Sequence, residues 1–304
     1  MNFIQAIWHK ISIRFRSQFP ALAAKMPALL ALIRIDKPVG IYLLLWPTIG
    51  ALWIAAEGIP PFALLFIFLF GTAIMRSAGC CVNDFADRKI DGMVSRTQQR
   101  PLATGALSRL DAIVCFLVLS LLGFTLVLFT NQKTVLLSLV AIVIIAIYPF
   151  MKRFTSLPQV ILGIAFSWGI LMAFTAATES IPQAAYLLFI ANCIWTVAYD
   201  TQYAMVDREF DIEIGVKSTA ILFGDGDKVI IGCLQFMFVA AMWLAGRQFE
   251  MGMFYYLGLL AASVLLIYQQ YLIKDRLPGL CFKAFLNNNW VGAVIFAGVV
   301  LSYL

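Results

Sequence analysis

Nine long apolar runs divide this chain, and they constrain its fold more than any other feature. They cover roughly residues 39–56, 61–82, 112–129, 134–150, 159–177, 183–199, 229–245, 252–272 and 286–303. Each run is long enough to cross the hydrocarbon core of a bilayer, which is about 30 Å thick. Hydrophobic residues make up 62% of the chain, and the runs lack the polar stripe of a soluble helix. The sequence therefore predicts an all-α membrane protein with about nine transmembrane helices.

Most of the 22 lysines and arginines fall on one side of these nine segments. They occupy the N-terminal arm and every second loop, whereas the intervening loops, such as 56–60 and 130–133, are short. Because cytosolic segments of membrane proteins are enriched in basic residues, the N-terminus is predicted to be cytosolic and the C-terminus external. The net charge of +6 then reflects topology, and no nucleic-acid partner is expected.

The N-terminal arm, residues 1–30, has its own pattern. Its basic residues alternate with isoleucine, tryptophan and phenylalanine, and its first 27 residues contain no continuous apolar run of signal-peptide length. This pattern is typical of an amphipathic helix lying on the membrane surface. We expect a cytosolic arm over 1–30 and one transmembrane domain over 31–304.

Two acidic motifs follow the second and sixth apolar runs, on the predicted cytosolic side. The first is Asn83-Asp84-x-x-Asp87-x-x-x-Asp91, and the second contains Asp200, Asp207 and Asp211. At 100° per residue of helix, the three aspartates of the first motif lie within about 60° of one another and those of the second within about 40°, so each set is predicted to line one helical face. Carboxylates that close repel one another, so both motifs predict bound cations.

Oxygen atoms are the metal ligands that this sequence offers. The chain has one histidine, His9, and its six cysteines show no C-x-x-C spacing. Carboxylate-rich sites suit Mg²⁺, which completes its coordination with water and substrate phosphates. A glycine-rich nucleotide-binding loop is absent from the sequence. We therefore expect Mg²⁺ bound to a diphosphate.

Several basic residues lie close enough in sequence to bind the same diphosphate. Arg76 lies inside the second apolar run, where an unpaired cation costs at least ~2.5 kcal/mol, so it requires a partner. Arg34 and Lys37 end the N-terminal arm, and Lys152 and Arg153 follow the fourth run. Lys37, Lys152 and Arg153 are equally compatible with charges that reach lipid headgroups.

The spacing of the acidic motifs also indicates an internal repeat. They follow segments four helices apart, and Asp87-Arg88-Lys89-Ile90-Asp91 is similar to Asp207-Arg208-Glu209-Phe210-Asp211. The pattern favours two four-helix units plus one further helix. Units related by an axis along the membrane normal would bring both motifs to the mouth of one central cavity.

Together these motifs resemble the UbiA-type intramembrane aromatic prenyltransferases. The resemblance extends from about residue 30 to the C-terminus, and it also includes Asp36-Lys37-Pro38, Tyr148-Pro149-Phe150-Met151-Lys152-Arg153 and Tyr199-Asp200-Thr201-Gln202-Tyr203-Ala204. It implies that residues 31–304 form a transmembrane prenyltransferase domain. It further implies a location in the bacterial inner membrane, with the active site on the cytosolic side.

Within that family, the resemblance implies transfer of a polyprenyl group from polyprenyl diphosphate to the ring carbon ortho to the hydroxyl of 4-hydroxybenzoate, in ubiquinone biosynthesis. Mg²⁺ would assist ionisation of the diphosphate. The implied metal ligands are Asn83, Asp84, Asp87, Asp91, Asp207 and Asp211. The implied catalytic residues are Asp84, Asp207 and Asp200, the last as an orienting group, a base or a structural ligand. The implied substrate-binding residues are Arg34, Arg76, Asn83, Tyr148, Lys152, Arg153 and Tyr199.

Two alternatives stay open at this point. The acceptor could be another aromatic compound, such as a dihydroxynaphthoate or homogentisate. A cation-coupled transporter would also carry acidic residues in its membrane segments, but it needs access from both sides, and the external loops here are short. The expected surroundings are membrane lipid, with no obligate protein partner.

Overall fold

The computed structural model describes residues 18–94 and 96–304, and this part of the chain is helical without strands. Its long helices are α3 (Val39–Ala55), α4 (Phe62–Asp87), α5 (Arg109–Val127), α6 (Gln132–Met151), α7 (Pro158–Thr178), α8 (Gln183–Ala204), α11 (Asp227–Gln248), α12 (Met253–Ile273) and α13 (Pro278–Ser302). Shorter elements are α2 (Pro20–Leu32), α9 (Arg208–Ile214), α10 (Thr219–Phe223), and the 3₁₀ turns η1 (Asp91–Met93) and η2 (Gly224–Gly226).

All nine predicted segments coincide with long helices. Seven helical stretches of the described chain are long and apolar enough to cross a membrane, while α3, at 17 residues, and the more polar α8 fall outside that group. The protein is therefore an integral membrane protein, as predicted. Three helices extend well past the predicted segments at one end: α4 continues past 82 to Asp87, α8 continues past 199 to Ala204, and α13 begins at Pro278 rather than at 286. All three extensions carry polar side chains.

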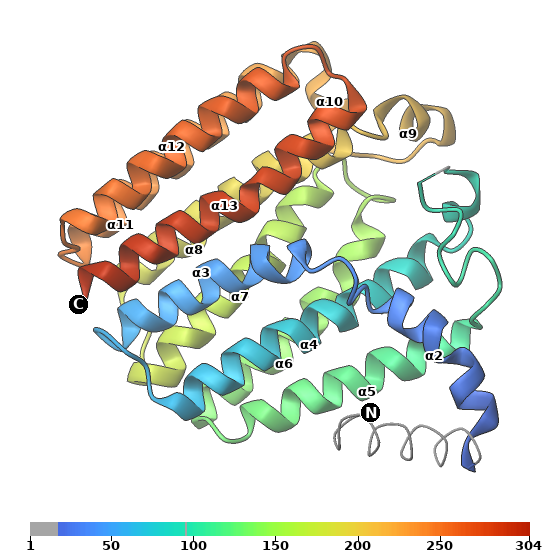
Figure 1. Cartoon of the computed structure of the whole chain (residues 1–304), viewed down its shortest axis with the longest axis horizontal. Coiled ribbons are helices and arrows are strands. Elements are labelled where there is room, and N and C mark those ends of the chain that lie inside the picture. The colour runs from blue at the N-terminus through green and yellow to red at the C-terminus, as the bar shows by residue number, and fades with distance from the viewer. Residues whose placement is uncertain (1–17, 95) are drawn as a thin grey trace, which may run out of the picture.

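The long helices lie side by side in one bundle (Figure 1). Each helix packs on the next in chain order, and α13 returns to pack on α3, so the ring closes. Helices α12 and α13 approach one another closely where Gly258 and Gly298 face each other. A Cβ atom built on Gly258 would lie 2.6 Å from the carbonyl oxygen of Val294. Small residues allow such close helix contact in membranes.

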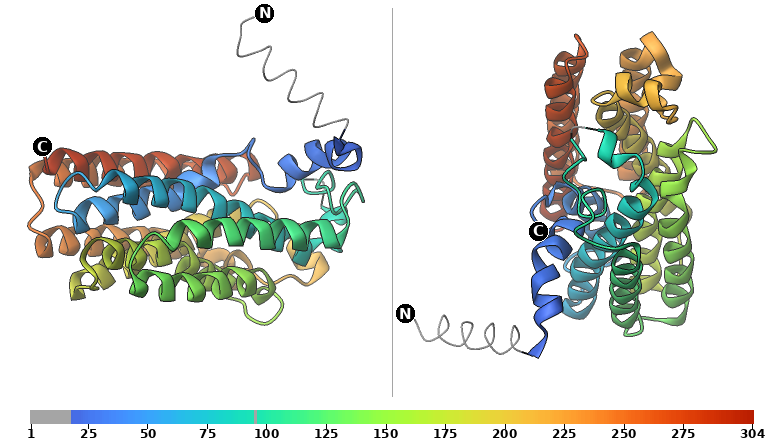
Figure 2. Two further views of the ribbon diagram at one scale, coloured as in Figure 1. Left: turned by 90° about the horizontal axis from the view of Figure 1, so that it is seen from below. Right: turned by 90° about the vertical axis from the view of Figure 1, so that its right-hand side faces the viewer.

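The long connections all lie at one end of this bundle. The loop between α4 and α5, the segment carrying α9 and α10, and helix α2 share that end, whereas the C-terminus lies at the other (Figures 1 and 2). This arrangement agrees with the predicted topology, in which both acidic motifs face the same side as the N-terminal arm.

The amphipathic-arm prediction falls mostly on residues 1–17, which lie outside the described residues. Within the described part, α2 begins at Pro20 and is joined to α5 by Lys25, whose Nζ donates to both carboxylate oxygens of Asp111 at 2.8 and 2.9 Å. The chain then turns at Arg34, whose φ of 52° lies in the left-handed region. This turn directs α3 back into the bundle.

The order of elements repeats along the chain. Helices α3 to α6 contain one long connection after their second helix, and α7, α8, α11 and α12 contain another at the equivalent place. Helix α13 is the additional helix. A symmetry axis relating the two units remains a prediction.

Candidate active site

A cavity of about 1000 Å³ opens at the end of the bundle where the long connections lie. Residues from both acidic motifs line it, although about 110 to 120 positions separate the motifs in sequence. Twelve of the predicted site residues line this cavity: Arg34, Arg76, Asn83, Asp84, Asp87, Asp91, Tyr148, Lys152, Tyr199, Asp200, Asp207 and Asp211. The two acidic motifs therefore belong to a single site.

The first motif begins on the last turns of α4, and its carboxylates face basic side chains. Asp84 is 1% exposed, and its Oδ1 lies 2.5 Å from Arg34 Nη2 and 3.3 Å from Arg100 Nη1. Asp87, one turn later, forms an ion pair with Lys152 at the end of α6. Asn83 Nδ2 lies 3.4 Å from the other Asp87 oxygen. These contacts connect α4 to α6 and to the residues before α3.

The prediction that each motif lies along one helical face is wrong. Helix α4 ends at Asp87, and Asp91 begins the separate turn η1. Helix α8 ends at Ala204, and α9 begins only at Arg208, so Asp200 lies on α8, whereas Asp207 lies just before α9 and Asp211 lies on it. At 1.5 Å per residue, a continuous helix would carry the later aspartates several ångströms further into water. The breaks instead turn them back over the cavity.

Arg100 links Asp91 to Asp84, a carboxylate near the end of α4. Its Nη1 lies 2.9 and 3.0 Å from the two Asp91 oxygens and also contacts Asp84. Burial raises the pKa of Asp91, and Arg100 opposes that rise. One guanidinium therefore joins two carboxylates of the first motif.

Arg96 joins the two acidic motifs to each other. It comes from the α4–α5 connection, yet its guanidinium forms an ion pair with Asp207, donates to the Tyr203 hydroxyl and lies 4.7 Å from the centre of the Tyr203 ring. Asp211 makes no ion pair with any residue that the structure describes. Burial and then the neighbouring Asp207 raise the pKa of Asp211 to about 6. Unlike Asp84, Asp87, Asp91 and Asp207, this carboxylate has no direct ion-pair partner among the described residues.

Arg76 lies in the wall of the cavity, inside α4. A partner was expected for it, and Arg76 makes no ion pair within the described ranges 18–94 and 96–304, which leaves it available to a bound anion. Its guanidinium instead lies against the backbone at Gly40: a Cβ atom there would be 2.4 Å from Arg76 Nε and Nη2. Glycine at position 40 therefore leaves the space that this cation occupies.

Helix α8 presents Tyr199, Asp200 and Tyr203 to the same cavity. A buried hydrogen-bond network holds the helix from behind. Trp195 Nε1 donates to Asn288 Oδ1 at 2.8 Å, and Asn288 Nδ2 donates to Gln202 Oε1 at 3.0 Å. Amide hydrogen bonds of this kind fix helix orientation where no water competes.

Three arginines show where sequence reasoning was incomplete. Arg96 and Arg100 were treated as topological charges, yet both contact the acidic motifs; their place five and nine residues after Asp91 was an available signal. Arg153, in contrast, does not line the cavity. Its Nη2 donates to the carbonyl oxygen of Ala86 near the end of α4. Arg153 thus holds the helix that carries Asp84 and Asp87.

The acidic motifs do not form a ready-made metal cluster. Among the described residues, no three acidic, histidine or cysteine side chains lie together as metal ligands do. The reason is visible in the contacts above, where basic side chains occupy the oxygens of Asp84, Asp87, Asp91 and Asp207. The available ligands are all oxygen atoms, as Mg²⁺ prefers, so their chemistry fits this ion.

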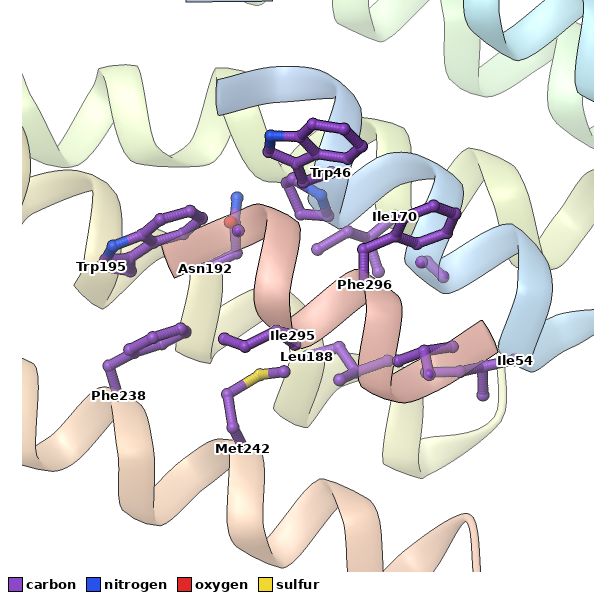
Figure 3. Close-up of a pocket in the computed structure, with 15 residues that line it drawn as sticks. Trp46, Ile54, Ile170, Leu188, Asn192, Trp195, Phe238, Met242, Ile295 and Phe296 are labelled. Carbon is purple, nitrogen blue, oxygen red and sulfur yellow. The ribbon is translucent and has the colours of Figure 1, made fainter. Parts of the chain in front are cut away.

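A second, smaller hollow lies among helices α3, α7, α8, α11 and α13 (Figure 3). Its volume is about 50 Å³, and none of its 15 lining residues is charged. Trp195 and Phe238 lie at one end of it, and Trp46 and Phe296 lie farther along. It could hold only a few atoms, and it lacks acid, base and metal ligands. The polar cavity is therefore the candidate active site.

Curated relatives resemble the chain over almost its whole length. A protein of Ectopseudomonas mendocina is 56% identical over 272 residues, which is 90% of this chain and 92% of the relative. One of Saccharophagus degradans is 54% identical over 283 residues, with 93% and 95% covered. Both relatives are named 4-hydroxybenzoate octaprenyltransferase.

Solved structures share the fold. The apo structure of a UbiA homologue from Aeropyrum pernix aligns with a TM-score of 0.78 at 25% identity, covering 89% of this chain and 99% of that one. A UbiA homologue from Archaeoglobus fulgidus, bound to GPP and Mg²⁺, aligns with a TM-score of 0.64 at 21% identity, covering 90% and 99%. The sequence pattern of the UbiA prenyltransferase family matches residues 44–297. The chain belongs to the UbiA prenyltransferase family.

Proposed function

We propose that this protein transfers a polyprenyl group from polyprenyl diphosphate to 4-hydroxybenzoate, at the ring carbon ortho to the hydroxyl, in ubiquinone biosynthesis. The names of relatives at 54% and 56% identity support the choice of substrates. The observation that carries the proposal is the shared cavity, which joins two acidic motifs to a membrane-embedded arginine without a described counter-ion. An anionic ligand with bound cations matches both features.

Mg²⁺ would be held by oxygens of Asn83, Asp84, Asp87, Asp91, Asp207 and Asp211. When bound, it would neutralise the charge that develops on the diphosphate as the allylic C–O bond breaks. The Mg²⁺-bound homologue of Archaeoglobus fulgidus supports this choice of ion. So does Asp211, a carboxylate that lines the cavity and makes no ion pair with a described residue.

The diphosphate itself would be bound by Arg34, Arg76 and Lys152. Arg34 and Lys152 now pair with Asp84 and Asp87, so they lie within reach of any anion that enters between the motifs. As the C–O bond ionises, the electron pair leaves with the diphosphate, and these cations stabilise it. The allylic cation stays on the polyprenyl chain, and exclusion of water from its part of the cavity would protect it from hydrolysis.

The aromatic acceptor would bind against Tyr148, Tyr199 and Asp200, which line the cavity on its α6 and α8 sides. We assign Asp200 to orienting or deprotonating the phenol, so that the ring attacks the allylic cation. Loss of the ring proton then restores aromaticity. Of the two candidates for the benzoate carboxylate, Arg153 lies outside the cavity lining. Arg34 would therefore bind that carboxylate with the N–H donors that the diphosphate leaves free.

Membrane placement suits such a donor. Each buried CH₂ of a polyprenyl tail contributes about 0.8 kcal/mol, so the tail stays in the bilayer. We place the protein in the bacterial inner membrane with the active site on the cytosolic side. The basic residues at the cavity end support this orientation.

The reaction can be tested directly. Membranes containing the protein would be incubated with Mg²⁺, a polyprenyl diphosphate and 4-hydroxybenzoate, a dihydroxynaphthoate or homogentisate in parallel, and prenylated products would be followed by mass spectrometry. We expect product with 4-hydroxybenzoate. Product with only another acceptor would contradict the proposed substrate, and the absence of any prenylated product would contradict the proposed reaction.

Gly40→Ala tests the role of Arg76. The new methyl group would displace the flexible end of the arginine rather than a backbone atom, so we expect normal folding. Because the guanidinium would move, KM for the polyprenyl diphosphate should rise about tenfold, the loss expected when a charged hydrogen bond of about 1.5 kcal/mol is misplaced. The matched control is Gly71→Ala in α4, where the added Cβ meets nothing within 4 Å. An unchanged KM in Gly40→Ala would contradict this role.

A further inference from the structure

Helix α9 carries the second acidic motif but buries no residue of its own. Its seven residues are all half-buried or exposed, with Asp207 directly before them and Asp211 among them. A helix this short is also well below the roughly 12 to 15 residues at which an isolated helix becomes marginally stable. The positions of both carboxylates therefore depend on polar contacts with other segments.

One such contact comes from outside the cavity, through Asp227. This carboxylate, at the first position of α11, is fully buried and does not line the cavity. Arg276, in the turn between α12 and α13, donates from Nε to both Asp227 oxygens at 3.1 and 3.0 Å and from Nη2 to Oδ1 at 2.7 Å. Arg208, the first residue of α9, completes the group, with Nη1 3.4 Å from Oδ2.

This group of Arg208, Asp227 and Arg276 is tightly constrained. Arg276 has a φ of 53°, in the left-handed region, and its Nη2 also donates to the carbonyl oxygen of Asp225 at 2.7 Å. A non-glycine residue persists in that conformation only when its surroundings hold it. Three segments, α9, α11 and the α12–α13 turn, therefore meet at one buried carboxylate.

The first acidic motif does not depend on a polar contact of this kind. Asp84 and Asp87 lie on the 26-residue helix α4, beside the fully buried Ala86, so apolar packing already fixes them. Asp207 and Asp211 lack such packing. Arg96 contacts Asp207 from within the cavity, and a bound ligand or cation would compete for that contact. The contact through Arg208 lies outside the cavity and would persist.

We propose that Asp227 is a positioning residue for the second acidic motif: through Arg208 it holds the start of α9 so that Asp207 and Asp211 face the cavity. The proposal rests on the proposed role of these two carboxylates in binding the metal and the diphosphate. Asp227 itself touches neither the cavity nor a reacting atom.

The test compares Asp227→Asn and Arg208→Gln with the wild type. In the purified, metal-free protein, Mn²⁺ binding measured by electron paramagnetic resonance should weaken about tenfold, as is usual when a group that orients metal ligands is lost. Amide hydrogen exchange over residues 207–216 should become faster. KM for the polyprenyl diphosphate should rise, while KM for 4-hydroxybenzoate and the melting temperature of Arg208→Gln should stay unchanged.

Asp275→Asn is the matched control. Asp275 adjoins Arg276 in the same turn, but its side chain is 60% exposed and pairs only loosely with Lys274, at 3.9 Å. We expect wild-type Mn²⁺ binding and exchange in this variant. An equal loss in Asp275→Asn would mean that any charge change near the turn suffices, and it would overturn the assignment.

Arg208→Gln keeps the test decisive if Asp227→Asn does not fold, because it leaves the Asp227–Arg276 contacts in place. Wild-type exchange over 207–216 and wild-type Mn²⁺ affinity in Arg208→Gln would overturn the proposal. If the wild-type protein itself bound no Mn²⁺, the proposed function would fail, whereas faster exchange over 207–216 in Arg208→Gln would still support anchoring by Asp227.

Discussion

Asp207→Ala is expected to lower prenyl transfer at least a hundredfold while the protein stays folded. The expected loss of transition-state stabilisation is much larger than the expected loss of folding stability. The Asp207–Arg96 pair is partly exposed, with 19% and 34% of the two side chains accessible, so its loss should cost at most ~1 kcal/mol of stability. Loss of a charged group that acts on the transition state typically costs 10²–10³ in rate.

The measurement is kcat and KM of the purified variant, with its melting temperature recorded beside the wild type. The control is Glu57→Ala, a carboxylate in the short turn between α3 and α4, at the other end of the bundle; it should be near neutral. A wild-type rate in Asp207→Ala would contradict the assignment of the second motif to the active site.

Asp84→Ala should be equally inactive but less stable than Asp207→Ala. Asp84 is 1% exposed and contacts both Arg34 and Arg100, so its removal leaves two cations poorly compensated. Breaking a buried ion pair by removing one partner typically costs about 3–5 kcal/mol. The difference in melting temperature between the two variants therefore measures how much more the buried Asp84 ion pairs contribute to stability than the partly exposed Asp207 pair.

The features that the sequence predicted correctly are those with a local cause. A helix must have a minimum apolar length to cross lipid, and that requirement is readable at each segment without knowledge of its neighbours. All nine segments were found for this reason. The cavity residues were also found where motifs lie next to helix ends, as with Asp84, Asp87 and Lys152.

What the sequence could not predict depends on contacts between distant segments. Arg96 and Asp207 are 111 positions apart, and their contact arises only because both long connections lie at the same end of the bundle. The breaks after Asp87 and Ala204 have a similar cause. Helical periodicity continues through both motifs, so the pattern alone could not show where the chain turns back over the cavity.

Arg76 and Arg153 show the same limit for single residues. Both are arginines close to a motif, and both were predicted to bind substrate, although Arg153 was equally compatible with a charge that reaches lipid headgroups. One lies in the cavity wall beside Gly40, and the other donates to the backbone at Ala86. The distinction depends on which way each helix face is turned, and this follows from packing across the bundle.

Chelation should abolish turnover without unfolding the protein. With EDTA in excess, we expect prenylation of 4-hydroxybenzoate to fall by at least a thousandfold and to return when Mg²⁺ is added beyond the chelator. The helical bundle should survive because Arg34, Lys152, Arg100 and Arg96 already pair with the four carboxylates that would otherwise repel one another.

The melting temperature in EDTA separates this expectation from a structural role for the metal. If Mg²⁺ were needed for folding, EDTA would lower the melting temperature and the rate together, as in proteins whose folding is coupled to metal binding. Here only the rate should fall. Asp211→Asn should slightly raise the melting temperature of the metal-free protein, because this variant removes a half-buried carboxylate that makes no ion pair with a described residue. Turnover that continues unchanged in EDTA would remove the metal from the mechanism.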